Sequence, residues 1–335
     1  MTGDALRCGV IGVAGAGERH GEGFVGADGA DLVAGADVVP DHAATFADQF
    51  DCAAYTDHVE MVENAALDAV SIATPSGTHA DIAVDCMEHG AHVICEKPLD
   101  VYLDRVDRMI EIADREDRTL AGIFQRRADP ANQRARDAIQ SGALGDPVLG
   151  DAHVKWHRTQ AYYDSGDWRG TRELDGGCMF NQGIHEIDLL QWLMGGVESV
   201  CAMTDTTAHE MECEDVAVVA LAFENGAYGT IEATTSTPAG TSRLEVDGTD
   251  GVYVPDERFV TADGERDLDA MPDPPDGPRS GQFQDFVDAV RAGRDPMVTG
   301  RAARDAVEVI LAAYASASLD RRVRLDELRD LTEHT

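Results

Sequence analysis

Hydrophobic residues in the first third of the chain form short, nearly continuous runs. They lie at residues 8–13, 32–36, 69–73, 92–95 and 120–124. These runs have the length of strands that are buried on both faces. Between them, segments such as 41–50, 80–88 and 103–115 place apolar residues at helical spacing. Strand and helix therefore alternate, which predicts a parallel sheet with helices on both faces and ligands at the carboxyl ends of its strands.

The pattern changes after residue 147. Alternating apolar and polar positions predict strands with two unlike faces at 148–158, 199–204, 215–223 and 227–235. We expect an α/β Rossmann domain over 1–125 and an α+β domain with an open, largely antiparallel sheet over 126–335, because 335 residues exceed one ordinary core. Residues 253–279, rich in Pro, Asp and Gly, read as a surface excursion. Residues 282–292 and 301–319 read as closing helices.

A glycine-rich turn follows the first predicted strand directly. It contains Gly12, Ala14, Gly15, Ala16 and Gly17, and a helix is expected from Glu18. The spacing is that of the dinucleotide fingerprint G-x-G-x-x-G with alanine in second place. Amide groups at such a helix start favour a pyrophosphate. Taken alone, the string also fits a flexible turn without a ligand.

Asp37 ends the second predicted strand, 20 residues after Gly17. A carboxylate there can accept hydrogen bonds from both adenosine ribose hydroxyls, and it would repel the 2′-phosphate of NADP. The next residues, Val38 and Val39, supply no arginine for that phosphate. We therefore expect NAD as the cofactor, with NADP disfavoured. The alternative is an ordinary surface aspartate.

Lys97 is one of two lysines in the chain, the other being Lys155. It follows the fourth predicted strand in the sequence Glu96-Lys97-Pro98, where the cofactor crevice should open. An ammonium group at this point can hold a substrate hydroxyl and stabilise developing negative charge on oxygen. A solvated lysine paired with Glu96 is the structural alternative.

With these motifs the chain resembles the glucose-fructose oxidoreductase, inositol dehydrogenase and rhizopine-catabolism (Gfo/Idh/MocA) family over almost its full length. The segments that carry the resemblance are 12–17, 73–79, 90–99, 124–127, 141–147, 167–171, 175–185 with Ile187 and Asp188, and 214–215. The resemblance implies that Thr74, Pro75, His79, Glu96 and Gln125 line the NAD cleft, with Lys97 facing nicotinamide and substrate. It also implies that Trp168 and Arg169 approach from the second domain, and that the protein is a homodimer or homotetramer.

Residues 181–194 predict a helix that Asn181 caps and that ends at Gly195-Gly196. Ile184, Ile187, Leu190 and Met194 form its apolar stripe, and His185 lies off that stripe. The resemblance assigns His185 as the general base that takes a proton from a secondary alcohol. Many relatives have aspartate at position 181. Asparagine can orient the histidine or a hydroxyl but supplies no charge.

Lys155, His157 and His153 alternate along one predicted strand and share a face. All three are candidate contacts for several substrate hydroxyls. A solvated or subunit-facing strand is the alternative. Arg158 falls on the opposite face by the same count, which disfavours it unless the strand twists.

The formal net charge is −36, with 63 acidic and 27 basic residues. This charge disfavours nucleic acid and anionic membranes as partners. Because molar salt shortens the screening length to about 3 Å, this charge predicts a halophile that accumulates salt in its cytoplasm. The alternative is an ordinary acidic protein in dilute salt. Seven scattered cysteines without a C-x-x-C pair indicate a reducing compartment and no metal site. The chain starts without a signal-peptide stretch and has no run of about 18 apolar residues.

The combined prediction is an NAD-dependent dehydrogenase that oxidises a secondary alcohol of a sugar or cyclitol. Lys97, His185 and Asn181 form the expected catalytic set, and Arg169 helps to orient the substrate. Two other classes stay open. One is an NAD-dependent glycoside hydrolase in which oxidation is transient, and the other is a non-catalytic NAD-binding sensor.

Overall fold

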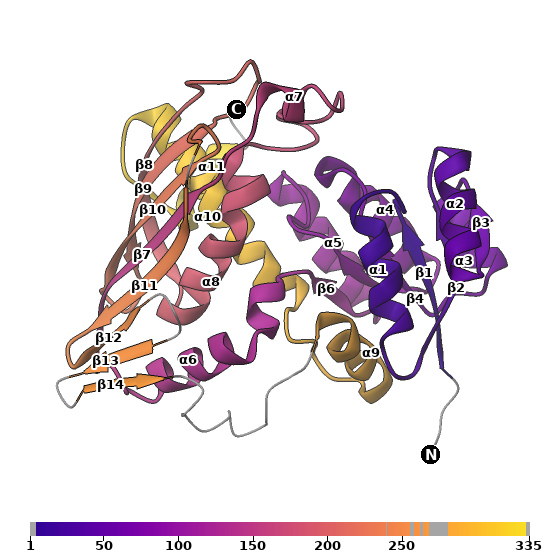
Figure 1. Cartoon of the computed structure of the whole chain (residues 1–335), viewed down its shortest axis with the longest axis horizontal. Coiled ribbons are helices and arrows are strands. Elements are labelled where there is room, and N and C mark those ends of the chain that lie inside the picture. The colour runs from indigo at the N-terminus through magenta and orange to yellow at the C-terminus, as the bar shows by residue number, and fades with distance from the viewer. Residues whose placement is uncertain (1–4, 239, 255–257, 262–263, 268–280, 333–335) are drawn as a thin grey trace. The chain divides into compact units, whose positions relative to one another are not determined.

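The computed structural model describes residues 5–238, 240–254, 258–261, 264–267 and 281–332 (Figure 1). The chain divides into two compact units. One comprises Met1–Gln125 with Arg279–Arg304, and the other comprises Arg126–Pro278 with Asp305–Thr335. The first unit therefore combines two stretches that are far apart in the sequence.

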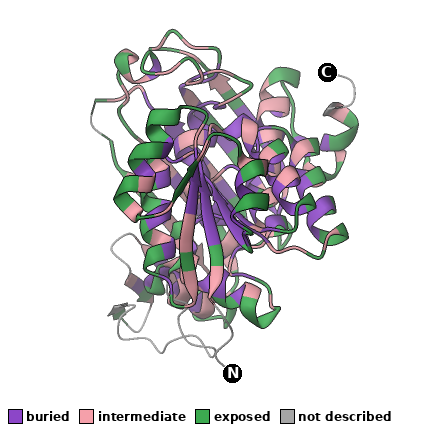
Figure 2. Ribbon diagram, turned by 90° about the vertical axis from the view of Figure 1, so that its right-hand side faces the viewer, coloured by how far each residue is buried: buried purple, intermediate pink, exposed green. Residues whose placement is uncertain are grey.

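The first unit is built on a six-stranded parallel sheet with the order β3-β2-β1-β4-β5-β6. Its strands are β1 (Leu6–Ile11), β2 (Ala30–Ala36), β3 (Ala53–Tyr55), β4 (Ala69–Ile72), β5 (His92–Cys95) and β6 (Leu120–Gly122). The central strands are buried because helices cover both faces of the sheet (Figure 2). The predicted parallel fold is confirmed. The short strand β3 was not predicted.

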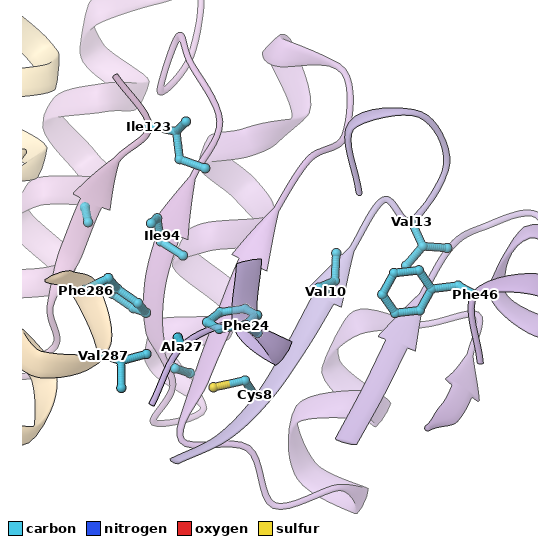
Figure 3. Close-up of a cluster of buried hydrophobic side chains, with 12 residues drawn as sticks. Cys8, Val10, Val13, Phe24, Ala27, Phe46, Ile94, Ile123, Phe286 and Val287 are labelled. Atoms are coloured by element: carbon cyan, nitrogen blue, oxygen red, sulfur yellow. The ribbon is translucent and has the colours of Figure 1, made fainter. Parts of the chain in front are cut away.

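The helices of this unit are α1 (Ala16–Val25), α2 (Pro40–Phe50), α3 (His58–Asn64), α4 (His79–Glu88), α5 (Leu103–Arg115) and α9 (Gln282–Ala292). The helix α1 begins two residues before the predicted start at Glu18, and α3 was not predicted. Helix α9 completes the core from a distant part of the chain. Its Phe286 and Val287 lie beside Phe24 of α1 in a cluster that also contains Val10 and Ile94 (Figure 3). This packing explains why α9 belongs to the first unit.

The second unit contains a nine-stranded sheet with the order β14-β13-β12-β11-β7-β10-β9-β8-β15. Its strands are β7 (Pro147–Lys155), β8 (Val197–Asp205), β9 (Val216–Phe223), β10 (Tyr228–Thr234), β11 (Ser242–Gly248), β12 (Gly251–Val254), β13 (Arg258–Thr261), β14 (Gly264–Asp267) and β15 (Val323–Arg324). The described pairs are antiparallel except β7 with β10, so the predicted largely antiparallel sheet is confirmed. The predicted surface excursion at 253–279 is wrong in part, since β13 and β14 extend the sheet. Residues 268–279 lie outside the described residues.

The helices of the second unit are α6 (Pro130–Gln140), α7 (Gln160–Tyr163), α8 (Ile184–Met194) and α11 (Leu328–Thr332). Helix α8 lies along one face of this sheet (Figure 1). Helix α10 (Gly300–Leu319) begins in the first unit and continues in the second. Helix α8 packs on β7, where a Cβ on Gly150 would lie 2.9 Å from the Leu190 side chain. Among the described residues, no helix has both the length and the apolar content needed to cross a membrane.

Candidate active site

The glycine turn lies between the end of β1 and the start of α1 and brings two backbone segments into close contact. A Cβ on Gly17 would lie 2.2 Å from the Gly12 carbonyl oxygen, and one on Gly12 would lie 2.7 Å from Thr74 Cγ2. Gly12 also has a φ of 79°. Ala14 and Gly15 are exposed at the helix start. The turn therefore fits the pyrophosphate of a dinucleotide, because helix amides can approach it closely.

Asp37 directly follows β2 and lies beside the glycine turn, since the Gly12 N–H donates to the Ala36 carbonyl at 2.8 Å. One carboxylate oxygen of Asp37 accepts the Val39 N–H at 2.9 Å and lies 3.4 Å from His42 Nδ1. Val38 beside it is 88% exposed. The carboxylate is thus at the carboxyl edge of the sheet, where a ribose of the cofactor is expected.

His79 connects the loops that follow β4 and β5. Its ring nitrogens lie 2.8 Å from the Pro98 carbonyl oxygen and 2.8 Å from the Thr74 carbonyl oxygen. The side chain is buried, and this burial lowers the pKa of His79 although both carbonyls favour protonation. The His79 ring therefore links the backbones of Thr74 and Pro98. Pro75 directly precedes the short helical turn Ser76–Thr78. Gln125 is exposed after β6.

Glu96 at the end of β5 is held by a buried histidine that was missed in the sequence. His20 Nε2 lies 3.1 Å from Glu96 Oε1, and His20 Nδ1 lies 2.7 Å from Ser71 Oγ. A neutral ring satisfies both contacts when Nε2 donates to Glu96 and Nδ1 accepts from the serine. Burial opposes ionisation of Glu96, but His20 and the positive charge of Lys97 lower its pKa to about 2.

Lys97 is fixed at its backbone by the same carboxylate. Its N–H donates to Glu96 Oε2 at 3.1 Å, and the Lys97–Pro98 peptide is cis. The hydrogen bond to Glu96 thus holds the Lys97 backbone directly after the carboxyl end of β5. The only sequence signal for His20 is its position on the buried face of α1, which gives no indication of the Glu96 contact.

In the second unit, Asn181 is part of a π-helical turn, Met179–Gly183, that continues into α8. Its N–H donates to the Gly177 carbonyl at 3.0 Å, so the prediction that Asn181 caps the helix is wrong. Its side-chain amide donates to the carboxylate of Asp175, and its oxygen accepts from Gln182 at 2.9 Å. Asp175 is the first residue of the segment 175–185, and no role of its own was predicted for it from the sequence.

His185 is in the first turn of α8, one helical turn after Asn181. It is partly exposed, whereas the predicted apolar stripe of this helix is buried, as expected. Two ion pairs hold the helix on either side of it. Arg126 contacts Glu186, and Arg127 forms two contacts with Asp188 at 2.5 and 2.8 Å. The start of the helix that carries His185 is therefore held by ion pairs whose carboxylates are buried.

A buried glutamate supports the turn that carries Asn181. Glu214 accepts the Met179 N–H at 2.9 Å and the Tyr314 hydroxyl at 2.9 Å. A Cβ on Gly177 would lie 1.6 Å from Glu214 Oε2, so only glycine fits beside this carboxyl group. Burial raises the pKa of Glu214 to about 7. The sequence showed Glu214 as part of a motif but gave no sign that it is buried.

Trp168 and Arg169 lie in a turn whose backbone Asp175 also holds. The Gly170 N–H donates to Asp175 Oδ2 at 2.7 Å. The Arg169 guanidinium carbon lies 4.4 Å from the Trp168 ring centroid, and Arg169 Nη1 donates to the Tyr162 hydroxyl at 2.7 Å. Asp175 therefore connects this turn to Asn181 within one unit.

Lys155 and His153 are on the sheet face that points away from α8. Lys155 Nζ pairs with Glu232 Oε2 at 2.6 Å, and His153 is opposite Glu232 in the neighbouring strand. His157 lies beyond the end of β7, is exposed, and pairs with Ser236. Lys155 is thus not brought together with His185, which fits the alternative of an outward-facing strand. The described part of the chain gathers no three His, Cys, Asp or Glu side chains as metal ligands.

Comparison with known proteins identifies the family. Residues 6–124 match the oxidoreductase family with an NAD-binding Rossmann fold, and residues 132–254 match the GFO/IDH/MocA C-terminal domain. The rhizopine catabolism protein MocA of Rhizobium meliloti is 30% identical over 78% of this chain and 78% of its own length. The chain belongs to the Gfo/Idh/MocA oxidoreductase family.

Other relatives in this family cover almost the whole chain. Myo-inositol 2-dehydrogenase of Thermotoga maritima is 29% identical over 96% of this chain and 99% of its own. The WlbA dehydrogenase from Bordetella pertussis, solved in complex with NADH and UDP-GlcNAcA, is 28% identical. It has a TM-score of 0.84 and covers 96% of this chain and 98% of its own. This Gfo/Idh/MocA protein is an NAD(P)-dependent oxidoreductase that acts on CH–OH groups.

Proposed function

We propose that this protein is a dehydrogenase that oxidises a secondary alcohol of a sugar or cyclitol with NAD. The observation that carries the proposal is the fixed Glu96–Lys97 turn at the carboxyl end of β5, in the same unit as the glycine turn and Asp37. The names of the myo-inositol and WlbA dehydrogenases support the substrate class. Asp37 and the exposed Val38 support NAD over NADP, because neither supplies a positive charge for a 2′-phosphate.

In the proposed reaction, some residues bind and orient the substrate and one residue accepts a proton. NAD, when bound, supplies the nicotinamide ring that accepts a hydride. The Lys97 ammonium donates to the reacting hydroxyl and stabilises negative charge on its oxygen. His185 accepts the hydroxyl proton at a ring nitrogen, while Asn181 and Arg169 orient the sugar. The alcohol is thereby oxidised to a ketone, because its carbon gives a hydride to the nicotinamide ring and its oxygen gives a proton to His185.

The direct test combines a substrate panel with two variants. Sugars, inositols and sugar acids are assayed with NAD and with NADP, and NADH formation is followed by its absorbance. Lys97→Met and His185→Gln should each lower kcat by about 100-fold or more, the range of a lost general acid–base or electrostatic contribution. Binding of NADH, measured by fluorescence, should change little. Near-normal turnover in both variants would exclude these roles.

We also propose that the protein works in a salt-rich cytoplasm as a homodimer or homotetramer. The outward face of the nine-stranded sheet supports self-association, since large apolar side chains are exposed there on adjacent strands. Met203 is opposite Val218 and Tyr228 is opposite Leu149, with exposures of 74%, 45%, 62% and 36%. Sedimentation equilibrium in molar KCl should give a dimer or tetramer mass, and Met203→Glu should shift it toward the monomer.

A further inference from the structure

Two arginines and three aromatic side chains alternate in a stack between β7 and the Asn181 turn. Arg158 Cζ lies 5.3 Å from the Trp156 ring centroid and 4.8 Å from that of Tyr162. Arg169 Cζ lies 4.3 Å from the same Tyr162 ring and 4.4 Å from the Trp168 ring. We call these five residues the arginine stack. In the order Trp156–Arg158–Tyr162–Arg169–Trp168, each guanidinium carbon thus lies close to two ring centroids.

Neither guanidinium of the arginine stack forms an ion pair with a residue that the structure describes. No carboxylate of the described residues lies within 4.0 Å of Arg158 or Arg169, although the chain has a net charge of −36. By contrast, Arg126 and Arg127 in the same unit each pair with a carboxylate. In a protein with so many acidic residues, two unpaired arginines side by side make a local positive site.

The hydrogen-bonding edges of both groups are only partly used. Arg158 Nη1 donates to the His157 carbonyl at 3.3 Å, and its buried Nε has no partner among the residues described. Arg169 donates to the Tyr162 hydroxyl through Nη1. Because stacking occupies the faces of a guanidinium and leaves its edges, N–H donors remain for a carboxylate or phosphate.

The arginine stack is held rigidly and is continuous with the Asn181 turn. His209 Nε2 lies 2.9 Å from the Arg158 carbonyl oxygen, and His209 Nδ1 lies 2.8 Å from Asp215. At the other end, Gly170 after Arg169 donates to Asp175, which accepts from Asn181. The arginine stack and the Asn181 turn are therefore joined through the carboxyl group of Asp175.

We propose that the arginine stack is an anion-binding subsite, so that the preferred substrate carries a carboxylate or phosphate in addition to its reacting hydroxyl. This inference rests on the dehydrogenase function proposed above and narrows its substrate class. The stack is built before binding, and little side-chain entropy is lost when the anion arrives. The same chemistry would also bind the pyrophosphate of the cofactor, and the experiment must separate these two sources.

Matched pairs of ligands test the proposal without a variant. Isothermal titration calorimetry at one fixed KCl concentration compares D-glucuronate with D-glucose, D-galacturonate with D-galactose, and myo-inositol 1-phosphate with myo-inositol. All titrations contain saturating NADH. In at least one pair, the charged member should bind about tenfold more tightly, the effect of one charge-assisted hydrogen bond. Equal affinities within every pair would overturn the proposal.

Variants then assign the effect to the stack. Arg158→Gln should weaken binding of the charged ligand by about tenfold and that of the neutral partner by less than about twofold. Arg108→Gln, which removes the same charge from the exposed surface of the first unit, is the matched control and should leave both unchanged. Circular dichroism confirms folding. If Arg158→Gln weakened only NADH binding, the anion would be that of the cofactor and the substrate subsite would be disproved.

Failure of this inference is distinct from failure of the proposed function. Ligand binding is measured here without turnover, whereas the dehydrogenase assignment depends on NADH formation. An enzyme that oxidised neutral sugars and ignored their acids would retain the proposed function and lose the subsite. Selective binding of the charged ligand without NADH formation would support the subsite and contradict the dehydrogenase.

Discussion

The side-chain amide of Asn181 donates a hydrogen bond to the carboxylate of Asp175. The same carboxylate accepts the Gly170 N–H at 2.7 Å and is buried. The buried carboxyl group of Asp175 is therefore in direct contact with the side chain at position 181. This contact fixes which side of the Asn181 amide faces Asp175 and leaves the oxygen side turned toward Gln182.

Removing the charge of Asp175 should impair catalysis more than substrate binding. We expect Asp175→Asn to lower kcat by about tenfold and to change KM by less than about threefold, because the Asn181 amide loses its charged acceptor. Steady-state kinetics check this, with Asp164→Asn, an exposed carboxylate in the same segment, as the control. An unchanged kcat would mean that Asp175 only holds the Gly170 turn, and Asp175→Glu should restore part of the loss.

The Asp37 carboxylate should determine the choice between NAD and NADP. We expect Asp37→Ser to lower kcat/KM for NAD and to raise it for NADP, so that the ratio shifts by about tenfold or more. The physical reason is the loss of two ribose hydrogen bonds and of repulsion toward a 2′-phosphate. Asp41→Ser, in the exposed first turn of α2, removes an equal charge and should leave the ratio unchanged. If the ratio of kcat/KM for NAD and NADP were the same in Asp37→Ser and Asp41→Ser, Asp37 would have no specific role in the choice of cofactor.

Glu214 should make stability depend on pH in the neutral range. Its pKa is about 7 in the folded protein against an ordinary value of 4.5, with burial as the main cause. A raised pKa means that the folded state keeps a proton that the unfolded chain releases. The resulting stability is complete below about pH 4.5 and is lost as pH rises through 7, at up to about 1.4 kcal/mol per pH unit.

Glu214→Gln isolates this effect, since glutamine does not titrate. Its amide oxygen can accept the Met179 N–H, and its amide nitrogen can donate to the Tyr314 hydroxyl. Thermal denaturation between pH 5 and 8 should show a steeper fall of Tm for the unaltered protein than for the variant. Tyr314→Phe, which removes one donor to the carboxylate, should raise the pKa of Glu214 further and move the fall to higher pH. Parallel curves for all three proteins would refute the assignment.

The extent to which the sequence predicted the structure depended on how local each interaction is. The strands around β1, β4 and β5 were evident because burial on both faces requires continuous apolar runs. The segments of β3 and α3, with three and seven residues, are too short to carry such a signal, and their formation depends on packing against neighbours. The turn at Asn181 was misread as a cap because nothing in the local sequence reveals the helical turn that precedes it.

In the candidate site, too, local motifs were predictable from the sequence and contacts between distant residues were not. Glycine spacing, Asp37 and the Glu96–Lys97 pair were found because each motif is contiguous. The contact of His20 with Glu96 spans 76 residues, and that of Tyr314 with Glu214 spans 100. Arg158 was discounted by strict strand alternation, which ends with β7 at Lys155, so the stack with Arg169 could not be foreseen.

Salt should stabilise this protein through screening of its own charge. At 0.1 M KCl the screening length is about 10 Å and at 1 M about 3 Å, so repulsion among the surface carboxylates is much reduced at the higher concentration. We expect Tm to rise steadily from 0.1 M to about 2 M KCl, and activity to follow it. A general salting-out effect would also raise Tm, and a charge variant separates the two causes.

The triple variant Glu22→Lys, Asp48→Lys and Glu111→Lys provides this separation, because all three side chains are exposed and the changes remove six units of negative charge. If self-repulsion governs stability, the variant should be more stable than the original protein at 0.1 M KCl, and its Tm should rise less steeply with salt. Identical slopes for the two proteins would attribute the salt effect to salting-out of apolar surface and would remove the support for a saline cytoplasm.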